Sequence, residues 1–165
     1  MTAVPVLAYV GLGANLGDTA AALKAALQAL RELPGTQLLR TSSFYRTAPI
    51  DSHGPDYLNA VAAVQTTLTP DGLLAHLQRI EQAGGRERPY RNAPRTLDLD
   101  LLLYGEARLA SSALTVPHPR LHERAFVLVP LAEIAPAGLV IPGHGALQNL
   151  LTLVADQAIH KLETP

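Results

Sequence analysis

The chain has 165 residues, of which 48% are apolar and 16% charged, with a net charge of −1 and no cysteine. This composition predicts one globular domain over residues 1–165 rather than a disordered chain. The near-zero charge gives no general attraction to nucleic acid or anionic membranes, and the lack of cysteine excludes disulfides and zinc–thiolate sites. Because the chain shows neither a signal peptide nor an apolar run of about 18 residues, we expect a cytoplasmic protein.

The first half of the chain predicts one helix and three strands. Asp18 is placed to cap a helix that reaches about Leu33, with leucines at helical spacing on one face. The loop over residues 46–56 contains proline and glycine. Strands are expected over Leu7–Leu12, Gln37–Tyr45 and Tyr57–Leu68, the last two antiparallel to each other.

A glycine-rich stretch, Gly11-Leu-Gly-Ala-Asn-Leu-Gly17, begins at the end of the first expected strand. Its G-x-G-x-x-x-G spacing differs from that of a dinucleotide-binding loop, and no Lys-Ser/Thr pair follows as in a P-loop. We therefore expect these glycines to serve a tight strand-to-helix turn.

The second half of the chain predicts three helices and a strand. Thr69 suits the N-cap of a helix, Pro70 its first position, and Gly84 with Gly85 its end. The order β-α-β-β-α-β predicts an α+β, ferredoxin-like sandwich with an antiparallel sheet flanked by helices. Later elements are expected as a strand over Thr96–Tyr104, a short element near Leu114–Val116, and helices over His122–Ile134 and Leu147–Val154.

Asp98 and Asp100 alternate with leucines in the strand expected over Thr96–Tyr104. Alternate side chains of a strand share a face, so both carboxylates point one way with Cα atoms about 7 Å apart. Aspartate forms strands poorly, and such departures tend to mark functional sites. If the two carboxylates bind a metal, hard oxygen ligands without a nearby His or Cys favour magnesium over zinc. The alternative is that both carboxylates are simply solvated on the polar face of the strand. The long leucine run predicts a central strand.

An arginine-rich loop precedes this strand and holds four of the 13 Lys and Arg residues, at positions 86, 88, 91 and 95. Arginine binds phosphate with a planar, bidentate guanidinium. Beside two aspartates, such a loop suits triphosphate chemistry, in which cations absorb the charge that moves to the leaving group. For Arg91 alone, a solvated side chain is the favoured interpretation.

Weaker signals come from five polar or aromatic positions. Tyr57 and Asn59 lie two apart on one strand face, where they could hold a flat heterocycle or form a plain cross-strand pair. Gln78 and Glu81 share a helix face, and by themselves they are surface residues. His118 lies between two prolines and is either structural or a phosphate ligand.

Eight short motifs follow one another over about residues 8–136. They are GLGANLG from Gly11, SSFYRTAP from Ser42, PDYLNA from Pro55, QRIE from Gln78, GRER from Gly85, APRTLDLDLLL from Ala93, LTVPHP from Leu114 and RAFVLVPL from Arg124. In this order they resemble the 6-hydroxymethyl-7,8-dihydropterin pyrophosphokinases of folate biosynthesis. Asn92-Ala93 stands where well-known bacterial members have Trp-Gly, and Pro119 replaces a frequent aromatic residue.

The resemblance implies in-line transfer of a diphosphate from ATP to the pterin hydroxymethyl oxygen, with release of AMP. It implies that Asp98 and Asp100 hold two Mg²⁺ ions and that Arg86 and Arg95 act with them in catalysis. The implied ATP-binding residues are Gln78, Glu81, Arg86, Arg88, Arg95, Leu101, Thr115, His118 and Arg124. The implied pterin-binding residues are Thr47, Pro49, Ile50, Tyr57, Asn59 and Phe126, although Phe126 on pattern alone would be a core residue.

Two other functions fit the same predicted fold. A non-catalytic nucleotide or pterin sensor would bind both ligands without turnover. An RNA-binding ferredoxin-like domain is disfavoured by the acidic strand and by the net charge. We expect a monomer with small-molecule substrates and neither a nucleic-acid nor a membrane partner.

Overall fold

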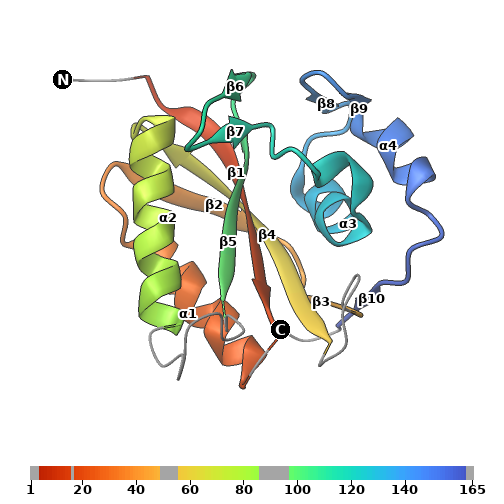
Figure 1. The fold of residues 1–165 in the computed structure, drawn as a ribbon, viewed down its shortest axis with the longest axis horizontal. Coiled ribbons are helices and arrows are strands. Elements are labelled where there is room, and N and C mark those ends of the chain that lie inside the picture. Colours follow the sequence, from red (N-terminus) through yellow and green to blue (C-terminus); the bar gives the residue numbers. More distant parts are fainter. Residues whose placement is uncertain (1–3, 16, 49–55, 86–96, 163–165) are drawn as a thin grey trace.

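The computed structural model describes residues 4–15, 17–48, 56–85 and 97–162, which form an antiparallel sheet with helices on both faces (Figure 1). The helices are α1 (Thr19–Arg31), α2 (Pro70–Gly85), α3 (Ala125–Ile134) and α4 (Leu147–Leu153), with a 3₁₀ turn η1 (Leu121–Glu123). The strands are β1 (Val6–Ala14), β2 (Thr36–Thr41), β3 (Tyr45–Thr47), β4 (Tyr57–Thr66), β5 (Asp98–Tyr104), β6 (Leu109–Ala110), β7 (Thr115–Val116), β8 (Val140–Ile141), β9 (Gly145–Ala146) and β10 (His160–Lys161).

The main sheet has the order β10-β3-β4-β1-β5, and β2 also pairs with β4. This arrangement confirms the predicted α+β sandwich and the antiparallel pairing of the second and third expected strands. Leucines of α1 and α2 pack on one face with Val10 and Leu12, and leucines of α3 and α4 pack on the other face with Tyr9 and Val61. Among the described residues, no helix is both long and apolar enough to cross a membrane.

Strand β5 lies at the edge of the sheet in the described part of the chain, so the prediction of a central strand is wrong. Its leucines are buried because both sheet faces are covered. The pairing with β1 skips one residue at Leu102, and this bulge turns Leu102 and Leu103 together toward the α3 side. Two backbone groups at the open edge of β5 have hydrogen-bond partners outside the sheet. The Glu81 carboxylate accepts the Leu99 N–H at 2.8 Å, and the His118 N–H donates to the Leu102 carbonyl at 3.0 Å.

The strand predicted over residues 37–45 is interrupted between β2 and β3. At the break the Ser42 N–H donates to the Val61 carbonyl at 2.8 Å, while the Ser42 hydroxyl accepts the Val61 N–H at 2.9 Å. A side-chain oxygen thus takes the place of a backbone carbonyl, and the chain leaves the ladder. Pairing resumes in β3, so Arg46 and Thr47 belong to a strand and not to the predicted loop.

Both predicted helix caps are present. The Asp18 carboxylate accepts the Ala21 N–H at 3.0 Å, and the Thr69 hydroxyl accepts the Gly72 N–H at 3.0 Å. The helix predicted over residues 122–134 is instead broken at Arg124, which is extended between η1 and α3 with φ −125° and ψ 113°. The last predicted helix is confirmed as α4.

A carboxylate near the end of α3 attaches this helix to the strand break. Glu133 accepts hydrogen bonds from the Ser43 N–H at 3.0 Å, the Ser43 hydroxyl at 2.8 Å and the Tyr45 hydroxyl at 2.7 Å. Burial by itself raises the pKa of Glu133, but these hydrogen bonds and the charge of Lys161 outweigh it and hold the pKa below its ordinary value.

We predict that Glu133→Gln lowers the free energy of unfolding at pH 7 by about 1 kcal/mol, because one accepting oxygen and its charge are lost. A lowered folded-state pKa means that the carboxylate stabilises the fold above its unfolded pKa of about 4.3 and loses this effect as the pH falls through the folded-state pKa. Urea unfolding at several pH values should therefore show that the difference in the free energy of unfolding between the variant and the wild type becomes smaller at acidic pH. Glu106→Gln, at an exposed carboxylate after β5, is the matched control. A gap that stays constant with pH would contradict this assignment.

Candidate active site

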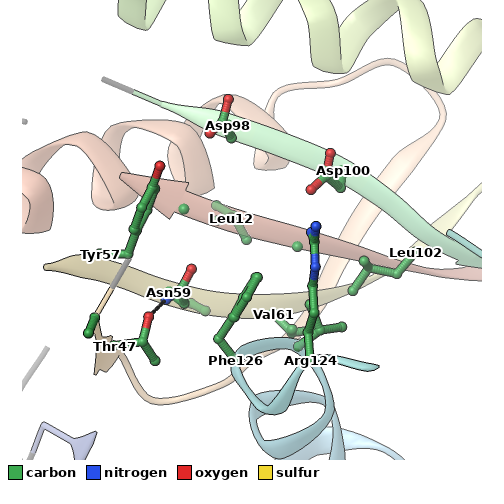
Figure 2. A pocket seen from close by; sticks show the side chains of 15 residues that line it. Leu12, Thr47, Tyr57, Asn59, Val61, Asp98, Asp100, Leu102, Arg124 and Phe126 are labelled. Atoms are coloured by element: carbon green, nitrogen blue, oxygen red, sulfur yellow. Dashed lines mark hydrogen bonds between the residues drawn. The ribbon is translucent and has the colours of Figure 1, made fainter. Parts of the chain in front are cut away.

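A cavity of about 220 Å³ opens on the sheet face that carries α3 (Figure 2). Its floor is formed by β1, β4 and β5, and its walls by Thr47 of β3 and by the start of α3. Asp98 and Asp100 both line it, whereas Leu97, Leu99 and Leu101 are buried in the opposite core. The predicted alternation of the acidic strand is therefore confirmed.

Two glycines of β1 lie in the middle of the cavity floor. Gly13 is the register partner of Asn59 on β4 and of Asp98 on β5, so it separates these two side chains by one strand. A Cβ atom at Gly13 would lie 3.1 Å from the Asn59 Oδ1, and one at Gly11 would lie 3.3 Å from Leu102. The missing side chains therefore keep the floor open between β4 and β5.

The prediction that these glycines serve a turn is wrong for Gly11 and Gly13, which belong to β1. It holds for Gly17, whose φ of +70° lies in the left-handed region that favours glycine. The sequence did carry a signal for the other two. Glycines spaced two apart in a strand remove side chains from a single face, which is where the cavity lies.

The β3–β4 end of the cavity combines aromatic and amide groups. The Asn59 Nδ2 donates to the Thr47 hydroxyl oxygen at 2.8 Å, and these residues are only 4% and 7% exposed. Tyr57 and Phe126 are half-buried and face the same cavity from β4 and α3 (Figure 2). Two rings beside a buried amide–hydroxyl pair can hold a flat heterocycle and bind its polar edge. The structure therefore places Phe126 at the cavity rather than in the core.

A second hollow of about 220 Å³ lies on the other side of the acidic strand. It brings together Leu101, Thr115 and His118, three of the residues implied in ATP binding, with the segment 111–114. Asp100 borders both hollows and its side chain is 49% exposed. The two hollows thus meet at a carboxylate, which is a suitable place for a reaction between two ligands.

His118 lies at this junction with its Nε2 4.0 Å from an Asp100 oxygen. Its Nδ1 accepts the Arg120 N–H at 3.3 Å, so the Nε2 carries the proton of the neutral ring. Burial lowers the pKa of His118, the charges of Arg124 and Arg120 lower it further, and Asp100 opposes them. At neutral pH His118 is therefore an uncharged hydrogen-bond donor.

Arg124 reaches from the start of α3 toward Asp100 (Figure 2). Its guanidinium carbon lies 5.3 Å from the centre of the Phe126 ring, a distance at which cation and ring attract each other. The arginine therefore connects the aromatic end of the cavity with its acidic end.

Other implied residues are not brought to either hollow. Gln78 is exposed on α2 and does not line them, and the Glu81 carboxylate holds the Leu99 N–H at the edge of β5. Pro49, Ile50, Arg86, Arg88 and Arg95 lie outside the described residues.

The described part of the chain has no group of three or more His, Cys, Asp or Glu side chains that could hold a metal ion. Asp98 and Asp100 alone could supply two oxygen ligands. This donor set fits Mg²⁺, which is commonly bound by one or two carboxylates, with water and substrate phosphates as the other ligands.

Comparisons with known proteins identify the family of this chain. Residues 9–136 match the family of 7,8-dihydro-6-hydroxymethylpterin-pyrophosphokinase (HPPK). The 2-amino-4-hydroxy-6-hydroxymethyldihydropteridine pyrophosphokinase of Haemophilus influenzae is 46% identical over 158 residues, which cover 95% of this chain and 98% of that protein. The protein of the same name from Pseudomonas aeruginosa is 44% identical over 155 residues, covering 93% of this chain and 95% of that protein.

Solved structures agree on the fold. A Plasmodium falciparum HPPK-DHPS triple mutant with SDX-DHP superposes with a TM-score of 0.70 at 15% sequence identity, over 90% of this chain. This chain spans 44% of the length of that solved chain. The resemblance drawn from the eight motifs is thereby confirmed, and the chain belongs to the 7,8-dihydro-6-hydroxymethylpterin-pyrophosphokinase family.

Proposed function

We propose that this chain transfers a diphosphate from ATP to the hydroxymethyl oxygen of 6-hydroxymethyl-7,8-dihydropterin and releases AMP, in tetrahydrofolate biosynthesis. The proposal follows the reaction after which its family is named. The observation that carries it is the meeting of two hollows at Asp100, one with aromatic and amide groups and one with His118. Such a layout suits a heterocycle and a polyphosphate that react at their contact.

The pterin ring lies in the first cavity, between Tyr57 and Phe126. The buried pair of Asn59 and Thr47 binds the polar edge of the ring, since both groups are already oriented by their mutual hydrogen bond. Pro49 and Ile50 belong to this site by motif alone. This placement directs the hydroxymethyl group toward the acidic strand.

ATP occupies the second hollow, with Leu101 and Thr115 near the adenosine and its phosphates toward Asp100. His118 and Arg124 bind phosphate oxygens, the first as a neutral donor and the second as a fixed cation. By motif, Arg86, Arg88 and Arg95 complete the phosphate site. Gln78 belongs to the ATP site by motif alone, and Glu81 acts through the strand that it holds.

Asp98 and Asp100 would hold magnesium, two ions in this proposal, and the bound metal would neutralise charge on the phosphates. The residues of the chain orient the pterin oxygen in line with the β-phosphorus and stabilise charge that develops on the leaving AMP. Positioning and electrostatics supply most of the acceleration, and no strong general base is needed.

We propose one domain over residues 1–165, because the same sheet contributes to both hydrophobic cores. A monomer is proposed because residues of one chain line both hollows. Dependence on ATP and the absence of cysteine favour the cytoplasm.

The reaction is tested by mixing the purified protein with ATP, Mg²⁺ and 6-hydroxymethyl-7,8-dihydropterin and identifying the nucleotide released. We expect AMP only when the pterin is present. Release of ADP would place the attack on the γ-phosphorus and contradict the proposal. Tight binding of both ligands without AMP would instead indicate a sensor.

We predict that Asp98→Asn and Asp100→Asn each lower kcat by about a thousandfold or more, because the charge that holds magnesium is lost. Steady-state kinetics measure this loss, and thermal melting should show a folded protein in both cases. Asp71→Asn, in the first turn of α2, is the matched control and should keep near wild-type turnover. Near-normal rates in either site variant would exclude the metal assignment.

We further predict that Gly13→Ala raises the KM for the pterin about tenfold, because the new methyl group displaces the Asn59 amide and costs one hydrogen bond. The KM for ATP should change much less. Gly11→Ala is the comparison variant, since its methyl group meets the Leu102 side chain and not the Asn59 amide, and it should have the smaller effect on the KM for the pterin. Equal effects of the two variants would mean that cavity volume, and not Asn59, determines pterin binding.

A further inference from the structure

The chain after α4 lies beyond residues 9–136, which match the family model, and it contacts the active-site wall. The Gln157 side-chain oxygen accepts the Ala125 N–H at 2.8 Å, and its Nε2 donates to the Glu123 carbonyl at 2.8 Å. These two backbone groups flank Arg124 on either side. One carboxamide thus clamps the residue that reaches toward Asp100.

The clamp fits the unusual backbone at this position. Arg124 is extended between two helical segments, and in extended chain the preceding C=O and the following N–H point to one side. Its own N–H donates to the Leu121 carbonyl at 3.4 Å, and its C=O accepts the Leu128 N–H at 3.0 Å. The remaining pair, the Glu123 C=O and the Ala125 N–H, needs a donor and an acceptor side by side, and Gln157 supplies both. Among side chains, only Asn and Gln carry a carboxamide with this combination.

The Gln157 contact also replaces a missing helix cap. Arg124 is the N-cap residue of α3, and its own side chain makes no capping hydrogen bond. The Ala125 N–H at the first position of α3 is satisfied by Gln157 instead. The guanidinium of Arg124 has no acceptor and cannot cap a helix N-terminus, so Gln157 supplies this contact while the Arg124 side chain points into the cavity and lies over the Phe126 ring.

The same segment is fixed to the opposite side of the cavity. In Figure 1 the blue C-terminal segment runs from α4 down to β10 beside β3. His160 and Lys161 pair with Arg46 and Tyr45 of β3, the strand that carries Thr47. Residues 157–162 therefore connect the α3 wall with the β3 side of the cavity.

We propose that Gln157 is a positioning residue for diphosphate transfer, which sets the backbone at Arg124 and hence the place of its guanidinium beside Asp100. The inference rests on the proposed function, because Arg124 matters only if its guanidinium binds phosphate. Gln157 itself lines neither hollow, so its effect must pass through Arg124.

The test is a double-mutant cycle on AMP release with Gln157→Met, Arg124→Ala and the double variant. We expect Gln157→Met to lower kcat/KM about tenfold, since small misplacements of a charge-stabilising group are costly. In the Arg124→Ala background the same change should lower kcat/KM by less than about twofold. The loss of melting temperature should be similar in both backgrounds, which separates positioning from stability.

Gln148→Met, at an exposed position of α4, is the matched control and should keep wild-type kinetics. If Gln157→Met does not fold, Gln157→Glu takes its place in the cycle, because it keeps the acceptor for the Ala125 N–H and loses the donor to Glu123. Equal losses of kcat/KM in both backgrounds, or no loss in either, would overturn the inference. An inactive wild type would overturn the proposed function itself, whereas an active wild type with an equally active Gln157→Met overturns the positioning role alone.

Discussion

The register of β1 between its two neighbours is the constraint on which the rest of the site depends. Because Gly13 is paired with Asn59 on one side and with Asp98 on the other, the amide proposed to bind a heterocycle and the carboxylate proposed to bind a cation lie on the two strands next to β1. Hydrogen bonding fixes strand separation at about 4.8 Å, so the span between these groups is set by the sheet and not by flexible side chains. A slip of β1 by one residue would bring Leu12 or Ala14 opposite Asn59 in place of Gly13, and a side chain would then fill the cavity floor.

Local patterns in the sequence predicted the faces correctly. Period-two alternation placed Asp98 with Asp100, and Tyr57 with Asn59, because each pair lies within one strand. Non-local features were missed for a common reason. The role of Gly11 and Gly13 appears only when β1 is known to lie between β4 and β5, and the edge position of β5 is hidden by leucines that are buried on both faces. The apolar pattern also runs through Arg124 without a sign of the break that Gln157 stabilises.

Charge at the junction follows from this layout. Asp98 and Asp100 share a face and repel each other, a cost that a bound cation removes. His118 contributes no charge at neutral pH because burial and the nearby arginines lower its pKa. Among the described residues that line the first cavity, the positive charge beside the acidic strand therefore comes from Arg124, at the start of α3. The position of α3 over the sheet consequently determines how well that charge complements a polyphosphate.

Hydrophobic packing alone would fix the distance of α3 from the sheet but not the rotation of the helix about its own axis. Nine of its ten residues are apolar and occur all around its axis, so the apolar character of its side chains alone distinguishes poorly between rotations of the helix. Directional hydrogen bonds resolve this ambiguity at both ends: Glu133, its one charged residue, binds Ser43 and Tyr45, and Gln157 binds the backbone beside Arg124. Glu133 thereby connects α3 directly to β3, and Gln157 connects it to β3 through β10. The aromatic wall of the cavity is thus oriented by polar contacts that lie outside the cavity.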